Sequence, residues 1–154
     1  MVLTKDELIN ALQNEMRILH HLASKVDPAK LDYRPTPKQR SLLELLQYMT
    51  IVGPIHLRAC LADAFDREAW GNTWRTEEAA AKVRNLEAVK AAIAKQPGLF
   101  AELLSSCTDR GSMIVSLVLC HFAAYRMQLF LYLKACGREE LSTLNLWAGM
   151  DAAS

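Results

Sequence analysis

The stretch that decides the fold is His121-Phe-Ala-Ala-Tyr-Arg-Met-Gln-Leu-Phe-Leu-Tyr-Leu-Lys-Ala-Cys-Gly137. It predicts the main part of a helix from Met113 to Cys136, ended by Gly137 in the left-handed conformation that glycine adopts without strain. The stretch has the outline of a metal-binding helix, because two ligands four residues apart lie on one face and can share a metal ion. Here the second of those positions is Tyr125, so the motif indicates architecture more than activity.

Two capping boxes mark helix starts earlier in the chain. In Thr4-Lys-Asp-Glu7 and Ser41-Leu-Leu-Glu44, a hydroxyl and a carboxylate can each satisfy an amide at the start of the helix. The first box predicts a helix from about Lys5 to Lys25, and the prolines of segment 32–37 predict an extended linker. The second box opens a helix that contains Gly53-Pro54, where a kink is expected and a break into two helices is the alternative.

The segment between the second and last helices is predicted to be less regular. Residues 66–76, which include Trp70 and Trp74, are interpreted as a loop whose indoles pack back on the body. A helical region is predicted from Glu77 to about Lys95, with Pro97 in the first turn of a continuation to about Ser106. Asp109-Arg-Gly-Ser112 is expected to break the chain, and residues 141–150 to add a short packed segment.

These elements favour a single all-α domain over residues 1–154. Long helices joined by short or proline-bearing links are typical of an antiparallel four-helix bundle. The second helix of that bundle is expected to be kinked, and a short C-terminal segment to follow the last. A chain of 154 residues can bury a sizeable core.

Composition excludes two kinds of partner. Eighteen Lys and Arg against seventeen Asp and Glu leave a net charge of +1, which argues against nucleic acid and against a charged membrane surface. The longest charge-free run, Gly111 to Tyr125, is shorter than a bilayer span. Because the N-terminus lacks the order of a signal peptide, a cytoplasmic protein is expected. The cysteines have no Cys-x-x-Cys spacing and are interpreted as buried free thiols: Cys60, Cys107, Cys120 and Cys136.

The apolar face of the last predicted helix also contains side chains that end in a polar group. His121, Tyr125 and Gln128 share that apolar stripe with aliphatic residues, and Gln47 does the same on the second helix. Bundles build ligand sites from such side chains on facing helices. The alternative is a hydrogen-bonded polar layer, because an unpaired buried polar group costs about 1–3 kcal/mol. We expect Gln47 and His121 to lie within reach of one another, directly or through water.

Two regions resemble the signature regions of the DinB-like (damage-inducible) superfamily. They are Ser41-Leu-Leu-Glu-Leu-Leu-Gln-Tyr-Met49, preceded by Leu31-Asp-Tyr-Arg-Pro35, and the stretch from His121 to Gly137. The resemblance implies a four-helix bundle, often dimeric, whose divalent metal is held by one histidine of the second helix and a His-x-x-x-His pair on the last. Some members of that superfamily are thiol-dependent S-transferases.

The resemblance retains one metal ligand of three. His121 matches the first histidine of the pair, whereas Tyr125 and Gln47 take the places of the other two. Glutamine offers a weak neutral oxygen and tyrosine ionises only near pH 10, so no ordinary Zn²⁺ or Ni²⁺ site is expected. His56 lies about 180° from Gln47 around an ideal helix, so a shared metal would require the Pro54 kink to re-aim it.

Two classes of function remain. The first is a homodimeric DinB-like bundle without a cofactor, which binds a small molecule or a partner in a remnant pocket lined by Gln47, His121, Tyr125 and Gln128. The second is a metal- or thiol-dependent transferase or hydrolase, which uses a divalent metal such as Zn²⁺ or Ni²⁺, or uses His121 and Tyr125 as an acid/base pair. The homodimer is expected from the superfamily and from apolar residues off the interior stripe: Phe122, Phe130 and Leu131.

Overall fold

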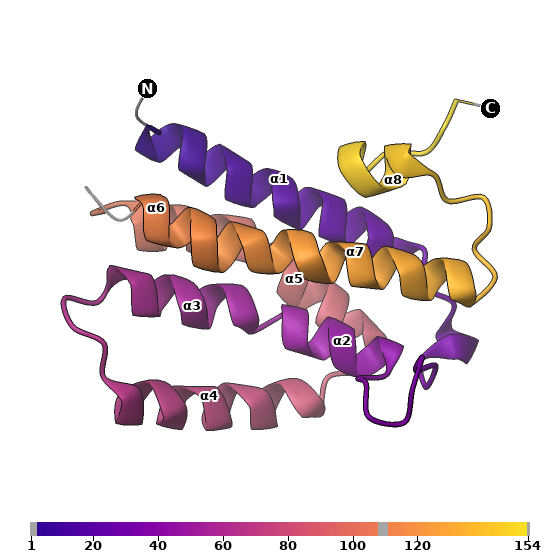
Figure 1. Cartoon of the computed structure of the whole chain (residues 1–154), viewed down its shortest axis with the longest axis horizontal. Helices are drawn as coiled ribbons and strands as arrows, with labels where there is room; N and C mark the ends of the chain where they lie inside the picture. Colours follow the sequence, from indigo (N-terminus) through magenta and orange to yellow (C-terminus); the bar gives the residue numbers. More distant parts are fainter. Residues whose placement is uncertain (1–2, 108–110, 154) are drawn as a thin grey trace.

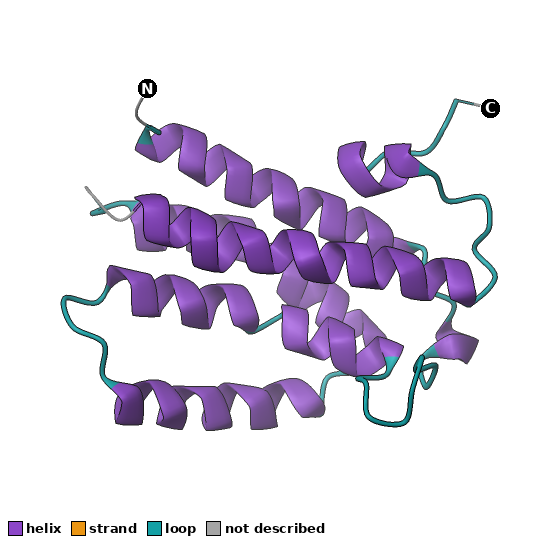
Figure 2. Cartoon of the chain, in the orientation of Figure 1, coloured by secondary structure: helices purple, strands orange, loops and turns teal. Residues whose placement is uncertain are grey.

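The computed structural model describes residues 3–107 and 111–153, and within these ranges all regular structure is helical (Figure 1). The view by secondary structure in Figure 2 shows the same helices joined by loops. The all-α prediction is therefore confirmed. The elements are α1 (Lys5–Ser24), η1 (Pro28–Lys30), α2 (Leu42–Met49), α3 (Val52–Leu61), α4 (Arg67–Lys82), α5 (Leu86–Leu104), α6 (Gly111–Ile114), the π-helical turn η2 (Val115–Leu119), α7 (Cys120–Ala135) and α8 (Thr143–Ala148).

The core lies between α1, the α2–α3 pair, α5 and the helix formed by α6, η2 and α7. α1 packs along α5, α2 packs on α7, and α3 packs on both α5 and η2. α4 contacts α2 and α3 from outside, and of its residues only Ala81 is buried. Figure 1 shows α4 as the outermost of these helices, beside α2 and α3. The largest side chains that are at most 1% exposed include Leu12, Met16, Leu46, Phe100 and Phe122.

The second predicted helix is broken rather than merely kinked. α2 ends at Met49 and α3 begins at Val52, with Pro54 in the first turn of α3. Proline has no N–H, so the carbonyl four residues before it loses its helical donor. The buried side chain of Gln96 on α5 replaces that donor: its Nε2 donates to the carbonyl oxygens of Met49 (3.1 Å) and Thr50 (3.2 Å). A side chain of α5 therefore stabilises the break.

The predicted starts of α1 and α2 and the predicted ends of α1 and α7 are confirmed. Both capping boxes are formed, with the hydroxyls of Thr4 and Ser41 accepting from the amides of Glu7 and Glu44. Gly137 has φ of +96° just after α7, as expected for its role as a left-handed cap. The predicted break at residues 109–112 falls partly outside the described residues.

The predicted element boundaries for residues 66–95 are wrong, although the indoles of Trp70 and Trp74 do pack on the body, against Ile51 and Ile55. Asp66 caps α4, because its carboxylate accepts from the amides of Glu68 and Ala69, both at 2.9 Å. Trp70 and Trp74 consequently lie on a helix and not in a loop. α4 ends at Lys82, and Asn85 caps a new helix, α5, in which Pro97 is an interior residue. Short polar side chains at these two N-caps set the boundaries.

The inward face of the last long helix also differs from the predicted stripe. Phe122 and Phe130 belong to the core, at 1% and 8% exposure, whereas Leu117 is 38% exposed. The π-helical turn η2 holds more residues per turn than an α-helix, and this rotates the residues before Cys120 relative to those after it. Of the three residues expected to form a dimer surface, only Leu131 is exposed.

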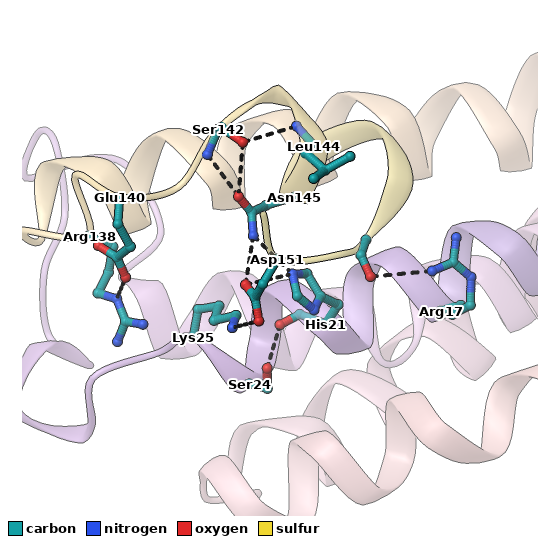
Figure 3. A network of polar contacts seen from close by, with 11 residues as sticks. Arg17, His21, Ser24, Lys25, Arg138, Glu140, Ser142, Leu144, Asn145 and Asp151 are labelled. Atoms are coloured by element: carbon teal, nitrogen blue, oxygen red, sulfur yellow. Dashed lines mark hydrogen bonds and ion pairs between the residues drawn. The ribbon is translucent and has the colours of Figure 1, made fainter. Parts of the chain in front are cut away.

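Two ionic arrangements hold helices together. Arg126 of α7 is 4% exposed, and its guanidinium donates to both carboxylate oxygens of Glu15 on α1 at 2.7 and 2.8 Å. Asp151 follows α8 in the chain, and its carboxylate accepts hydrogen bonds from Lys25 (2.6 Å) and Asn145 (3.0 Å), as Figure 3 shows. The second arrangement connects the C-terminal segment to the end of α1.

By length and composition, one helix in the described part of the chain could cross a membrane. It is Gly111–Ala135, and 33% of its most apolar 18-residue window is buried. Much of an apolar helix is therefore uncovered within this single chain. Cys120 lies on that helix and is exposed, Cys107 and Cys136 are partly buried, and the prediction of buried thiols is confirmed only at Cys60.

Candidate functional site

A cavity of about 450 Å³ lies between α2, the segment before it and the C-terminal part of α4. This volume falls in the range of small-molecule sites. Apolar walls are formed by Leu43, Tyr48, Ile51 and Ala81. The polar residues of the lining are Asp32, Arg34, Arg40, Ser41, Glu44, Gln47, Glu78 and Lys82.

Most of the charges around the cavity neutralise one another. Arg34 donates to Glu44 at 3.0 Å, and Lys82 lies 3.3 Å from Glu78. The capping bond from the Ser41 amide is the main reason that the pKa of Glu44 is lowered. These pairs leave Arg40 and Asp32 as the charged side chains of the lining that have no ionic partner among the described residues.

Arg40 is held in place in two ways. Its guanidinium carbon lies 4.0 Å from the centre of the Tyr48 ring, which is a cation–π contact. Its carbonyl oxygen accepts from the Tyr132 hydroxyl at 3.0 Å. The guanidinium carbon lies over the Tyr48 ring, and the described residues form no hydrogen bond to the guanidinium N–H groups. A positioned donor group therefore lies at the wall of the cavity.

Gln47 lies in the same wall and is 6% exposed. Its side-chain amide donates to the carbonyl oxygens of Lys82 (3.2 Å) and Arg84 (2.8 Å), at the C-terminal end of α4. These carbonyls have no helical donor of their own, so Gln47 satisfies them. Gln47 thus connects α2 to α4 and takes part in a hydrogen-bonded polar layer.

His121 and Tyr125 belong to a row of aromatic rings between α2, α3, α4 and α7. The ring centre of Tyr125 is 4.8 Å from that of Tyr48 and 6.0 Å from that of His121. The ring centre of His121 is 4.7 Å from that of His56. Burial, and then the neighbouring Tyr125 hydroxyl, raise the pKa of Tyr48. The row consists of Tyr48, Tyr125, His121, His56, Trp70 and Trp74, and we call it the aromatic row.

His56 comes to His121 because the helix breaks. On an unbroken helix it would point away from the face of Gln47, but the break at Thr50 and Ile51 re-aims the residues of α3. Burial and then the neighbouring His121 lower the pKa of His56, so its neutral form is favoured. The sequence signal for this contact is Pro54. It predicts a local change of helix direction, but it does not predict which residues of α3 then face α7.

Gln128 lies in a different place. Its Nε2 donates to the Tyr132 hydroxyl at 2.8 Å, and that hydroxyl in turn donates to the backbone carbonyl oxygen of Arg40. Gln128 lines a separate groove of about 490 Å³ between α7 and residues 33–39. Of the four residues proposed from sequence, the structure brings His121 and Tyr125 together. Gln47 lines the cavity beside α2 and Gln128 lines the separate groove, and each has its own hydrogen-bond partners, so the four residues do not line one pocket.

The aromatic row offers at most two nitrogen ligands side by side. No group of three or more His, Cys, Asp or Glu side chains that could hold a metal ion occurs within residues 3–107 and 111–153. A structural metal site commonly needs four ligands and a catalytic one three. The sequence matches no protein-family model, and it matches neither a curated protein nor a solved structure.

Proposed function

We propose that the chain binds a small organic carboxylate in the cavity beside α2, without metal chemistry. The observation that carries this proposal is Arg40, whose guanidinium lies against Tyr48 at the cavity wall with its N–H groups free of partners among the described residues. Arginine binds a carboxylate by two parallel hydrogen bonds, and the N–H edge remains available when the guanidinium stacks on a ring. Leu43 and Ile51 would contact the apolar body of the ligand.

We propose further that the chain is a divergent DinB-like bundle. In this interpretation its four helices are α1, the α2–α3 pair, α5 and the helix of residues 111–135, while α4 lies outside. The signature-like regions lie on α2 and α7 in that arrangement, and of the superfamily's three ligands only His121 is retained. Loss of the other two supports a binding function over a metal-dependent one.

The proposal is tested by calorimetric titration with benzoate and hexanoate, and with benzamide and hexanamide as neutral counterparts. We expect the acids to bind and the amides to bind at least tenfold more weakly. Arg40→Gln should abolish that preference for acids. Lys38→Gln is the matched control, because Lys38 is an exposed cation of the same segment that does not line the cavity. Equal binding of acids and amides, or no effect of Arg40→Gln, would contradict the proposal.

A second function is favoured by one specific observation, the contact between His56 and His121. Two adjacent imidazoles next to the Tyr125 phenol could transfer protons, or ligate a metal together with a substrate. Titration of untagged protein with Zn²⁺ and Ni²⁺ separates this function from the first. Sub-micromolar binding that His121→Ala abolishes would replace carboxylate binding by a metal-dependent enzyme as the preferred function.

A further inference from the structure

A second cavity, of about 250 Å³, lies at the break between α2 and α3. It is formed by residues of that break, of α3, of α4 and the loop after it, and of α5. In Figure 1, α5 runs behind the junction of α2 and α3, and α4 lies beside α3. The volume is just below the range of about 300–1,000 Å³ that is usual for drug-sized ligands, so the cavity suits a small molecule. We call it the α3–α5 cavity.

Positive side chains from three elements line the α3–α5 cavity. Arg58 comes from α3, Arg84 from the loop between α4 and α5, and Lys95 from α5. Within residues 3–107 and 111–153, none of these three side chains forms an ion pair with a carboxylate. The lining also contains one carboxylate, Glu77, so three cations and one anion leave two positive charges. This balance favours a doubly charged anion as the occupant.

Arg84 is held in a fixed position at this cavity. Its Nη1 donates to the Thr50 hydroxyl at 2.7 Å, and that hydroxyl donates to the carbonyl oxygen of Gln47 at 2.6 Å. The backbone of Arg84 is fixed as well, since its carbonyl oxygen accepts from Gln47 at 2.8 Å and its amide donates to Ala81 at 3.0 Å. The other N–H groups of the guanidinium form no hydrogen bond to the described residues. They are available for the paired hydrogen bonds that arginine makes to phosphate oxygens.

Gln96 is the most buried polar residue of the lining, at 2% exposure. Its Nε2 donates to the carbonyl oxygens of Met49 and Thr50, but its Oε1 accepts no hydrogen bond from the described part of the chain. Buried acceptors are nearly always satisfied, because an unsatisfied one destabilises the protein. A hydroxyl group of a molecule bound in the cavity would supply the missing donor.

We infer that the α3–α5 cavity binds the phosphate monoester of a small hydroxylated molecule. A phosphate monoester carries a charge of about −1.5 to −2 at pH 7, which matches the two positive charges of the lining. The Arg84 guanidinium would bind the phosphate oxygens, and Arg58 and Lys95 would add to the attraction. The cavity shares only Ile51 with the lining of the cavity beside α2, so the inference does not depend on carboxylate binding there.

Calorimetric titration with glycerol 3-phosphate tests the inference, with glycerate and glycerol as counterparts of lower charge. We expect glycerate to bind at least tenfold more weakly than the phosphate ester, and glycerol to give no measurable heat. Preferential binding of the ester supports the inference. Equal binding of the ester and glycerate, or no binding of the ester, would overturn it.

Substitutions locate the binding site. Arg84→Gln should weaken the binding of glycerol 3-phosphate at least tenfold. Lys95→Gln should weaken it at least threefold, and because Lys95 is exposed this variant should fold normally. Arg75→Gln is the matched control, since Arg75 is an exposed arginine of α4 that does not line the cavity. If both Arg84→Gln and Lys95→Gln bind the ester as the wild type does, the inference is wrong.

A phospholipid headgroup presents the same phosphate monoester as a free metabolite. Sedimentation with phosphatidylcholine vesicles that contain phosphatidate separates these two sources. The protein should remain in the supernatant, because Arg84 is partly buried and held against Thr50, away from a flat bilayer surface. Sedimentation with the vesicles that Arg84→Gln abolishes would overturn the free ester as the ligand.

Discussion

The substitution Gly53→Ala tests how the break between α2 and α3 is packed. A methyl group at Gly53 would lie 2.2 Å from Cζ of Phe122 and 3.0 Å from Cζ of Phe100. Carbon atoms in contact are normally about 3.5–4.0 Å apart, so the Phe122 ring would have to move by more than about 1 Å. Both rings are at most 1% exposed and pack on each other, with their centres 5.9 Å apart, so there is little space for that movement.

The expected magnitude is a balance of two terms. Overpacking a buried site costs about 3 kcal/mol at the upper end of its usual range. Replacing glycine by alanine within a helix stabilises the folded state by about 1 kcal/mol. The net loss is therefore about 2 kcal/mol, or about 4–8 °C in Tm for a chain of this size.

Urea denaturation followed by circular dichroism measures the effect, and Gly98→Ala is the matched control. Gly98 lies within α5 with nothing within 4 Å of the added methyl group. The control should therefore stabilise the protein by about 0.5–1 kcal/mol. If both substitutions stabilise the protein, the close packing of Phe122 on Gly53 is refuted.

Three further predictions concern the ion pair of Arg126 and the aromatic row. Arg126→Met should lower the free energy of unfolding by about 3–5 kcal/mol, because it leaves the Glu15 carboxylate without its partner. Most of that loss should be recovered in the double variant with Glu15→Leu, and an additive loss in urea denaturation would exclude the pairing. Because the pKa of His56 lies below its usual 6.5, the stability linked to its neutral form is present above that pH and is lost as the pH falls through the lowered pKa. Tm should thus decrease from pH 7 to pH 5, and less steeply in His56→Gln; parallel profiles would count against this. Tyr125→His should create measurable Zn²⁺ affinity by calorimetry, since it adds a third imidazole next to His121 and His56; no heat of binding would show that the three rings do not converge.

The parts of the fold that depend on local hydrogen bonds were readable in the sequence. The hydroxyls of Thr4 and Ser41 bond within one helical turn, so the chain around each of them is sufficient to predict a helix start. Asp66 and Asn85 give the same kind of signal. At Asp66 the composition of Trp70-Gly-Asn-Thr-Trp74 favours a loop and outweighs the cap signal, although a capped helix tolerates a single glycine there.

The parts of the site that depend on distant contacts could not be predicted in this way. The sequence predicts Gln47 in the interior but does not predict its partners. These are the carbonyl groups of Lys82 and Arg84, which lack a helical hydrogen-bond donor only because α4 ends at Lys82. The contact of His56 with His121 depends on the angle between α2 and α3, which Gln96 on a third helix stabilises. The sequence around Arg40 does not indicate a site, because an arginine in a linker is usually solvated, and only the folded chain places it on Tyr48.

Carboxylate binding in the cavity beside α2 is tested most directly by heteronuclear NMR of ¹⁵N-labelled protein titrated with benzoate. Saturable chemical-shift changes are expected at the backbone amides of Arg40, Tyr48 and Ala81, which line the cavity. The amides of His56 and Trp70, farther along the aromatic row, should change little. Changes centred on His56 and His121 instead, or changes that do not saturate, would contradict carboxylate binding at Arg40.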